Sequence, residues 1–472
     1  MKHFFIGAGL LLSLSASAQS VAEKLKLSWD RFAGDSQLRA GIASICVVDA
    51  ASGNVVFERN SGIGLAPASS QKVITAATAY EWLGKDFTYK TTLYGDSLLS
   101  ARNPAGRLYI IGSGDPTLGS WRWKSTSMDS VLAKFTSAVR QNAPRGFQCI
   151  VAPVVNWDTE VIPPGWIWDD LGQYYGAGAE ILNWHENQFD VILRSGPSIG
   201  DPVAVVRSEP RVSDSIASLA TAAPAGTGDQ IYLYPANNGR PLTVRGTIPV
   251  SQAAFPVGAA LPDPGRVLIM QLEQSLAKAG LAPKKAFERN AKGYSVRWMA
   301  THNSPPLDSI VYWFLRKSIN LYGEALIKTF AASDGAWTPE GNSIPRKLYP
   351  ASTTRGAELL RTFWKERGID PVELRVKDGS GLSPENRVTT HAQVQVLQYA
   401  RRQAWFPGFY LALPEYNGMK IKSGTIGGVK AFCGYHTSKA GVTYTVSFIV
   451  NNYNDSERSI IQKMYAVLNE LK

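Results

Sequence analysis

The sequence predicts an α/β fold in which one domain is divided by a long, mostly β insertion. Strands and helices alternate closely at both ends of the chain, whereas residues 88–295 are rich in glycine, proline and short apolar runs. The chain of 472 residues is longer than one hydrophobic core usually organises. We therefore expect residues 19–87 and 296–472 to form one domain, and residues 88–295 to form one or two inserted accessory domains.

The first 18 residues have the pattern of a secretory signal. Met1, Lys2 and His3 precede an apolar run over residues 4–14, and residues 16–18 supply the small side chains that cleavage requires. This run is shorter than the roughly 20 residues that a membrane-spanning helix needs. We expect removal of residues 1–18, export to the periplasm or cell envelope and no transmembrane segment; peripheral membrane contact stays open, and a buried N-terminal helix is the alternative.

Composition indicates a globular protein, with 44% hydrophobic and 18% charged residues. Cys46, Cys149 and Cys433 are too few and too scattered for a disulfide framework and lack metal-binding spacing. The formal net charge of +11 suits anionic surroundings such as cell-wall polymers or nucleic acid. No basic block with interleaved aromatic residues occurs, so we predict no nucleic-acid partner.

Local patterns predict the elements at the two ends. Residues 41–49 and 55–57 read as two strands joined by turn residues, which is typical of a hairpin. Residues 69–83 follow Pro67 and have a helical pattern. Near the C-terminus we expect a strand over residues 443–450 and an amphipathic helix over residues 459–471.

A Ser-x-x-Lys motif stands at the start of the helix predicted after Pro67. Ser69 and Lys72 are three residues apart, so on a helix they share one face and can touch. A serine hydroxyl needs a base to become a good nucleophile, and a lysine can serve when burial or a nearby cation lowers its pKa. Free backbone N–H groups at a helix start also favour developing negative charge.

The motif alone is weak, because Ser275 and Lys278 match it too. That second copy lies within the helical pattern of residues 267–279, where a solvated lysine is the simpler interpretation. The argument for Ser69 therefore depends on its companions.

Two further motifs follow in the chain. Ser318 and Asn320 form Ser-x-Asn, whose hydroxyl can relay a proton while the amide binds a substrate carbonyl. Lys422, Ser423 and Gly424 place a cation, a hydroxyl and a residue without a side chain on an expected strand, which suits a substrate carboxylate. Three motifs in this order are the set found in penicillin-recognising serine enzymes.

With these motifs the chain resembles the class C low-molecular-mass penicillin-binding proteins, which are D-Ala-D-Ala carboxypeptidases and endopeptidases. The resemblance covers most of the chain, including the large insertion between the first and second motifs. Its further segments are Gly-Asp-Pro-Thr-Leu at residues 114–118, Tyr-Gly-Ala at 175–177 with Asn187, Ser-Pro-Pro-Leu at 304–307, and Asp-Gly-Ser-Gly-Leu-Ser at 378–383 with Asn386 and Arg387.

The resemblance implies a penicillin-binding serine transpeptidase-like domain, an antiparallel sheet flanked by helices. It also implies roles: Ser69 is acylated, Lys72 is the base, and Ser318 and Asn320 complete the proton path. Lys422, Ser423, Gly424 and Thr425 would bind the substrate and its terminal carboxylate, while the backbone N–H groups of Ser69 and Thr425 would form the oxyanion hole. Ser423 stands where threonine is usual, which keeps the hydroxyl and drops a methyl group.

These features predict acyl transfer on peptidoglycan stem peptides, with β-lactams as covalent inhibitors and no metal or organic cofactor. The insertion is expected to shape access for polymeric peptidoglycan. A β-lactamase and a catalytically silent cell-wall-binding protein are the alternatives. Taken singly, Ser318 and Asn320 could cap a helix or be ordinary polar residues on its surface, and Ser423 and Gly424 could form an ordinary turn. The scattered histidines allow no Ser-His-Asp triad to be assigned.

Overall fold

The computed structural model describes residues 20–100, 103–212, 215–237, 241–289, 296–333 and 350–472. The predicted signal, residues 1–18, lies outside these described residues. The segments around the three predicted motifs all lie within them.

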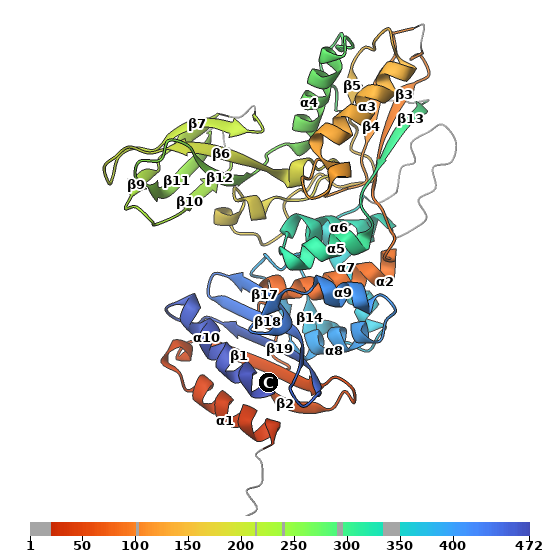
Figure 1. Cartoon of the computed structure of the whole chain (residues 1–472). Coiled ribbons are helices and arrows are strands. Elements are labelled where there is room, and N and C mark those ends of the chain that lie inside the picture. Colours follow the sequence, from red (N-terminus) through yellow and green to blue (C-terminus); the bar gives the residue numbers. More distant parts are fainter. Residues whose placement is uncertain (1–19, 101–102, 213–214, 238–240, 290–295, 334–349) are drawn as a thin grey trace, which may run out of the picture.

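A six-stranded sheet joins the two ends of the chain, as Figure 1 shows in its lower half. Its strands run in the order β16-β17-β18-β19-β1-β2, and each neighbouring pair is antiparallel. The bounds are β16 (Glu415–Tyr416), β17 (Met419–Ile426), β18 (Val429–Thr437), β19 (Thr443–Asn451), β1 (Ile42–Asp49) and β2 (Val55–Arg59). The predicted hairpin of β1 and β2 and the predicted C-terminal strand are confirmed.

Both faces of this sheet are covered, which explains the continuous apolar runs of its central strands. Residues 43–48 of β1 and 444–451 of β19 are all buried. On one face lie α1 (Val21–Ala33) and α10 (Glu457–Leu468), with Trp29 of α1 against Phe448 of β19. On the other face, α8 (Thr390–Arg401) bonds to β1 through Thr390 and Ser44, whose hydroxyl oxygens are 2.7 Å apart.

Helix α2 (Lys72–Leu83) runs through the middle of the helical layer. Residues 72–80 are all buried, as expected for a helix that other helices surround. Its neighbours in the layer are α5 (Leu307–Arg316), α6 (Asn320–Ser333), α7 (Thr353–Lys365), α8 and α9 (Phe406–Ala412). This burial places the first residue of α2, Lys72, deep in the protein.

The chain between α2 and α5 forms the upper half of Figure 1. One sheet contains β13 (Val296–Asn303), β3 (Lys90–Asp96), β4 (Leu108–Ile111) and β5 (Ile150–Val151). Two further sheets project to one side (Figure 1). Their strands are β6 (Gln188–Arg194), β7 (Ala204–Glu209), β8 (Ile216–Ser218), β9 (Thr221–Ala223), β10 (Gln230–Tyr234), β11 (Leu242–Pro249) and β12 (Phe255–Ala260).

This region is less purely β than the sequence indicates. Besides the helix expected near residues 267–279, observed as α4 (Pro264–Lys278), it contains the unpredicted α3 (Met128–Asn142). Strand β13 pairs with β3 across the expected boundary at residue 295. The proposed division into domains therefore stays a prediction.

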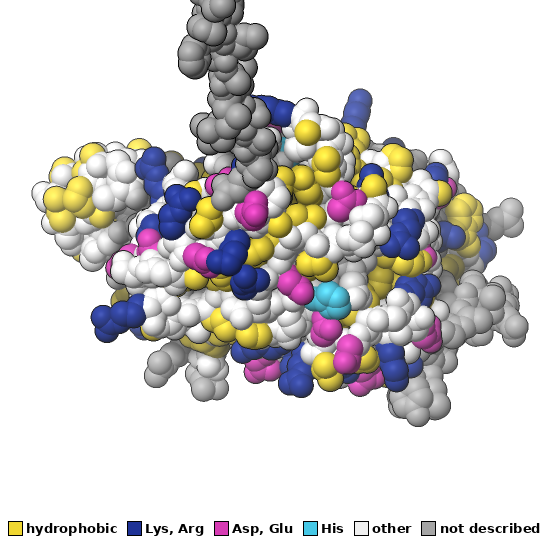
Figure 2. Space-filling model, turned by 90° about the horizontal axis from the view of Figure 1, so that it is seen from below, with side chains coloured by type: hydrophobic (Ala, Val, Ile, Leu, Met, Phe, Trp, Pro, Cys, Tyr) yellow, Lys and Arg dark blue, Asp and Glu magenta, His cyan; other side chains and the backbone are white. Residues whose placement is uncertain are grey.

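The described residues also bear on the cysteines, on charge and on membrane crossing. Cys46, Cys149 and Cys433 are free and buried. Figure 2, a view from below, shows basic and acidic side chains interspersed with hydrophobic ones on that face. No helix in the described ranges combines the length and the apolar character that a bilayer crossing requires.

Candidate active site

Ser69 lies in a tight turn that enters helix α2. The turn is the 3-10 helix η2 (Ala68–Gln71), and Ala68 has a positive φ of 45°. Ser70 stabilises the turn, since its hydroxyl donates to Pro67 O at 2.7 Å and accepts from Gln393 Nε2 of α8 at 2.9 Å. The turn leaves Ser69 partly exposed at a cleft of about 820 Å³.

Lys72 contacts the serine hydroxyl directly. Its Nζ lies 2.8 Å from Ser69 Oγ, 2.6 Å from Asn320 Oδ1 and 2.8 Å from Ser380 O. The amide and backbone oxygens can only accept hydrogen bonds. A neutral amine has two N–H groups for these two acceptors, which leaves its lone pair for the hydroxyl proton of Ser69. The geometry therefore suits Lys72 as a base toward Ser69.

Asn320 holds this arrangement from the first residue of α6. Its Nδ2 donates to Tyr175 O at 2.8 Å, so its Oδ1 faces Lys72. Neither bond caps the helix, and both tie the Asn320 side chain to the site. This disfavours the alternative that Asn320 is a helix cap or an ordinary polar residue on the helix surface. Ser318, two residues earlier, has a positive φ of 58° and lines the same cleft as Ser69.

Burial, and then the positive charge of Lys422, hold the pKa of Lys72 well below its usual value. The carboxylates of Asp378 and Glu324 act in the opposite direction with smaller effects. A lowered pKa enlarges the neutral, basic fraction of Lys72 at neutral pH. The surroundings thus supply the condition that a lysine base requires.

The third motif lies on β17, beside the serine turn. Gly424 packs so closely that a Cβ built on it would lie 2.6 Å from Pro67 O and 2.9 Å from Ser69 N. Thr425 follows it and lines the cleft. Lys422 is only 1% exposed, and its Nζ donates to Ser423 O at 2.6 Å. A substrate carboxylate that reaches Lys422 would replace this backbone acceptor.

Burial lowers the pKa of Lys422 to about 7, with a smaller contribution from Lys430, while Cys433 acts in the opposite direction. Carboxylate binding needs the cationic form, and that form is lost as the pH rises through this pKa. We expect kcat/KM for a carboxylate-bearing substrate to rise with pH as Lys72 becomes neutral and to fall above about pH 7 as Lys422 loses its proton.

Comparing the pH profile of the wild type with that of Lys422→Arg checks this expectation. Arginine keeps its charge across this range, so the alkaline fall should disappear or move to much higher pH. An unchanged alkaline fall in Lys422→Arg would assign it to another group.

The loop at residues 378–383 contributes more to the site than the sequence indicates. The sequence indicates only a segment shared with the family, and in the structure this loop supplies the carbonyl of Ser380 to Lys72. Asp378 organises the loop by accepting bonds from the backbone N–H groups of Gly381 at 2.7 Å and Ser383 at 2.6 Å. Asp378 O also accepts from Gln71 of the serine turn at 2.7 Å.

Glu324 is a second buried acid near the site. It lies one helical turn after Asn320 on α6, is 0% exposed, and accepts from Gly379 N at 3.1 Å. Burial, and then the charge of Asp378, raise the pKa of Glu324. The four-residue spacing from Asn320 is the sequence signal that could have identified it.

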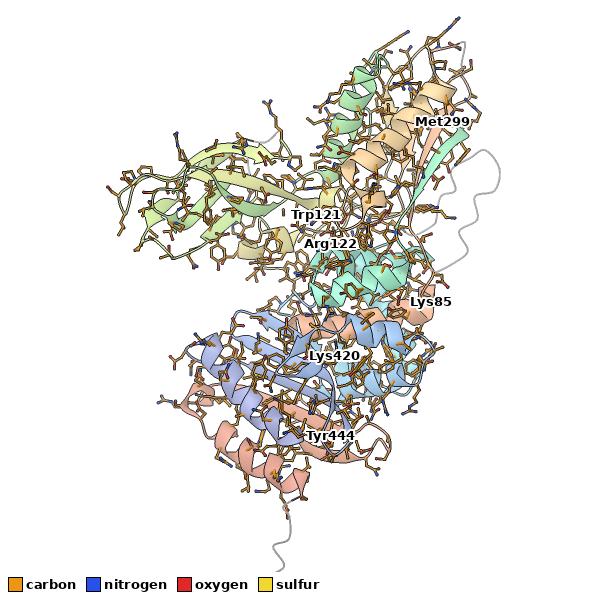
Figure 3. All side chains as sticks on the ribbon, in the orientation of Figure 1. Lys85, Trp121, Arg122, Met299, Lys420 and Tyr444 are labelled. Carbon is orange, nitrogen blue, oxygen red and sulfur yellow. The ribbon has the colours of Figure 1, made fainter. Side chains whose placement is uncertain are left out.

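A buried ion pair fixes α6 against the inserted region. Glu186 is 0% exposed and accepts from Arg122 Nε at 2.7 Å and from the hydroxyl of Tyr322, on α6, at 2.8 Å. Figure 3 places Arg122 and Trp121 at this junction, and the Arg122 guanidinium lies 5.0 Å from the centre of the Trp313 ring on α5. Helix α6, with Asn320 at its start, is therefore bonded to the inserted region.

The second Ser-x-x-Lys copy differs from the first in its surroundings. The hydroxyl oxygens of Ser275 and Thr136 are 2.8 Å apart, and Lys278 is exposed at the end of α4. Within the described ranges, no group of three or more His, Cys, Asp or Glu side chains could hold a metal ion.

Comparisons with known proteins identify the family of this chain. The D-Ala-D-Ala carboxypeptidase 3 (S13) family matches residues 25–471. The chain is 25% identical over 497 aligned residues to a D-alanyl-D-alanine carboxypeptidase of Actinomadura sp. (strain R39), covering 98% of this chain and 87% of that protein. It is 21% identical over 439 residues to the D-alanyl-D-alanine carboxypeptidase DacB of Haemophilus influenzae, covering 85% and 84%.

Solved structures show the same fold. Penicillin binding protein 4 (dacB) from Haemophilus influenzae superposes with a TM-score of 0.76 at 19% identity, covering 91% of this chain and 96% of that chain. The same protein in complex with a β-lactam superposes with a TM-score of 0.71 at 19% identity, covering 96% and 99%.

Proposed function

Since the chain belongs to the D-Ala-D-Ala carboxypeptidase 3 (S13) family, we propose that it hydrolyses D-Ala-D-Ala bonds of peptidoglycan stem peptides through an acyl-enzyme on Ser69. It is a low-molecular-mass class C penicillin-binding protein and a serine-type hydrolase. The observation that carries the residue assignment is the contact of 2.8 Å between Lys72 Nζ and Ser69 Oγ.

The proposed reaction has two halves. Neutral Lys72 takes the Ser69 proton as Oγ attacks the carbonyl carbon, and the backbone N–H groups of Ser69 and Thr425 bind the resulting oxyanion. The peptide C–N bond breaks, the leaving D-alanine nitrogen receives the proton through Ser318, and Lys422 with Ser423 holds the terminal carboxylate. Water then attacks the ester and releases Ser69.

We propose endopeptidase action on D-Ala-to-diamino-acid cross-links at the same site. The cleft is continuous from Ser69 to Asp169 and Asp170, so it extends beyond the reacting atoms. Carboxylates there suit the free ammonium group of a diamino acid. We also propose covalent inhibition by β-lactams, which carry the equivalent carbonyl and carboxylate.

A product analysis tests this proposal. We expect a stem pentapeptide to lose one D-alanine and a cross-linked peptide dimer to yield two monomers, both detected by liquid chromatography with mass spectrometry. Ser69→Ala should abolish both products. Cleavage of the pentapeptide alone would remove the endopeptidase part, and cleavage of neither by the wild type would contradict the function.

Export remains a proposal that follows from the substrate, because peptidoglycan lies outside the cytoplasm. The pattern of residues 1–18 supports it. An N-terminal sequence beginning at Gln19 on protein recovered from cells is the expected result, and a retained Met1 would oppose it.

The alternatives are less well supported. A silent cell-wall-binding protein would not need a buried lysine in contact with a cleft serine. The family and the named relatives are carboxypeptidases, which disfavours a β-lactamase.

A further inference from the structure

Several large aromatic side chains are exposed along and beside one wall of the active-site cleft. Trp168 is 46% exposed, Tyr174 is 52% exposed and Tyr232 is 48% exposed. Tyr174 and Tyr232 line the same cleft as Ser69, and the ring of Trp168 stacks on that of Tyr234, with centres 6.4 Å apart. We call Trp168, Tyr174, Tyr232 and Tyr234 the aromatic wall. Aromatic groups gathered in a cleft mark binding surfaces more often than isolated exposed ones do.

The wall combines two segments that are distant in sequence. Trp168 begins the 3-10 helix η4 (Trp168–Asp170), and Tyr174 begins η5 (Tyr174–Gly176). Tyr232 and Tyr234 alternate on β10 with buried Ile231 and Leu233, so both tyrosines face the same side of the strand.

The backbone beneath the wall is well supported. Gly172 lies so close to β10 that a Cβ on it would overlap Leu233 O. Trp166 Nε1 donates to Asp378 Oδ2 at 2.8 Å, and Tyr175 O accepts from Asn320 Nδ2 at 2.8 Å. The segment that carries Trp168 and Tyr174 is therefore hydrogen-bonded to Asp378 and Asn320 on one side and packed against β10 on the other. The wall has a defined position relative to Ser69.

The polar groups around the wall also indicate its ligand. Gln188 lines the same cleft, and the Arg245 guanidinium lies 5.5 Å from the centre of the Tyr234 ring. Aromatic faces bind the C–H faces of sugar rings, while neighbouring amide and guanidinium groups bond to hydroxyl and acetamido groups. This mixture of flat apolar surfaces with scattered acceptors and donors is suited to carbohydrate.

We propose that the aromatic wall binds the N-acetylated amino sugars of the glycan strand while the attached stem peptide reaches Ser69. The proposal rests on the proposed function, because that function supplies a substrate in which glycan and peptide are joined. The continuity of the cleft from Ser69 to Tyr232 lets one substrate contact both places. The inserted region thereby favours polymeric over sugar-free substrate.

The test compares two substrates on a double variant, Tyr174→Ala with Tyr232→Ala, whose two rings both line the cleft. D-Alanine release is measured from a disaccharide-linked pentapeptide and from the same pentapeptide without sugar. We expect KM for the linked substrate to rise about tenfold or more, because two stacking contacts are lost. KM for the sugar-free peptide and the rate of acylation by benzylpenicillin should change by less than about twofold.

A matched control variant carries Trp298→Ala with Tyr416→Ala. These side chains are 62% and 37% exposed, do not line the cleft, and should leave both KM values unchanged. An equal rise in KM for both substrates in the cleft variant would show that the wall binds peptide and would overturn the proposal. An unchanged KM for the linked substrate would overturn it too.

Calorimetric titration with peptide-free glycan chains separates this proposal from the proposed function. Binding by the wild type, lost in the double variant and kept in the control variant, is expected even if no peptide is cleaved. Absence of binding by the wild type, with normal peptide cleavage, would overturn the sugar site while leaving the hydrolase intact.

Discussion

Lys72→Arg should slow acylation of Ser69 by about 1,000-fold, within the range expected for the loss of a positioned general base. An arginine keeps its positive charge in proteins, so it cannot take the Ser69 proton. It can still donate to Asn320 Oδ1 and Ser380 O, which accept from Lys72 in the wild type. The change therefore removes the base and retains a donor to both oxygens, and it places a fixed positive charge where the wild-type base is neutral.

The rate constant for benzylpenicillin acylation, followed by quenched mass spectrometry, measures this effect. Lys85→Arg is the matched control, because Lys85 follows the same helix and is exposed to solvent (Figure 3). Lys72→Met tests the same step without a charge and should also be slow. Thermal unfolding verifies that the variants fold, and acylation by both Lys72 variants within about tenfold of the wild type would exclude the lysine base.

Gly424→Ala is the second change with a large expected effect. The added methyl group would lie 2.6 Å from Pro67 O, 2.7 Å from Ser70 N and 2.9 Å from Ser69 N. All three are backbone atoms, which cannot move aside as the end of a flexible side chain can. Strand β17 must shift, and Thr425 N shifts with it. Removing one oxyanion-hole donor lowers kcat by about 100- to 1,000-fold in known enzymes, so we expect the acylation rate to fall by about 100-fold.

Gly427→Ala provides the comparison, since a Cβ at Gly427 meets nothing within 4 Å. It lines the same cleft and should acylate at nearly the wild-type rate. The two acylation rates are measured side by side with the unfolding temperatures of both variants. Equal rates would show that the close approach of β17 to the serine turn is not needed for catalysis.

Much of the site could be predicted because its side chains follow short, local patterns. Ser69 and Lys72 are one turn apart, so helical spacing brings them together, and Ser318 and Asn320 lie close in sequence at the start of α6. The carbonyl of Ser380 is different: it lies 308 residues from Lys72 in sequence, and any residue type could supply it. A backbone acceptor leaves no signal in the side-chain pattern.

The fold likewise contains elements that the sequence pattern predicts and elements that it does not. Strand β1 could be identified because burial on both faces demands a continuous apolar run. Helix α3 was not predicted, although Val131, Phe135 and Val139 repeat at helical spacing. The surrounding sequence is rich in glycine and proline, which are typical of turns between short strands. The aromatic wall could not be predicted, because Tyr174 and Tyr232 line one cleft only when β10 folds against the segment at Gly172.

The acyl-enzyme on Ser69 is the central claim, and the intact mass of the protein after incubation with benzylpenicillin tests it most directly. We expect the wild type to gain the mass of one benzylpenicillin and Ser69→Ala to gain none, with the modified peptide containing Ser69. No adduct on a folded wild-type protein, or an adduct that persists in Ser69→Ala, would contradict the assignment of Ser69 as the nucleophile.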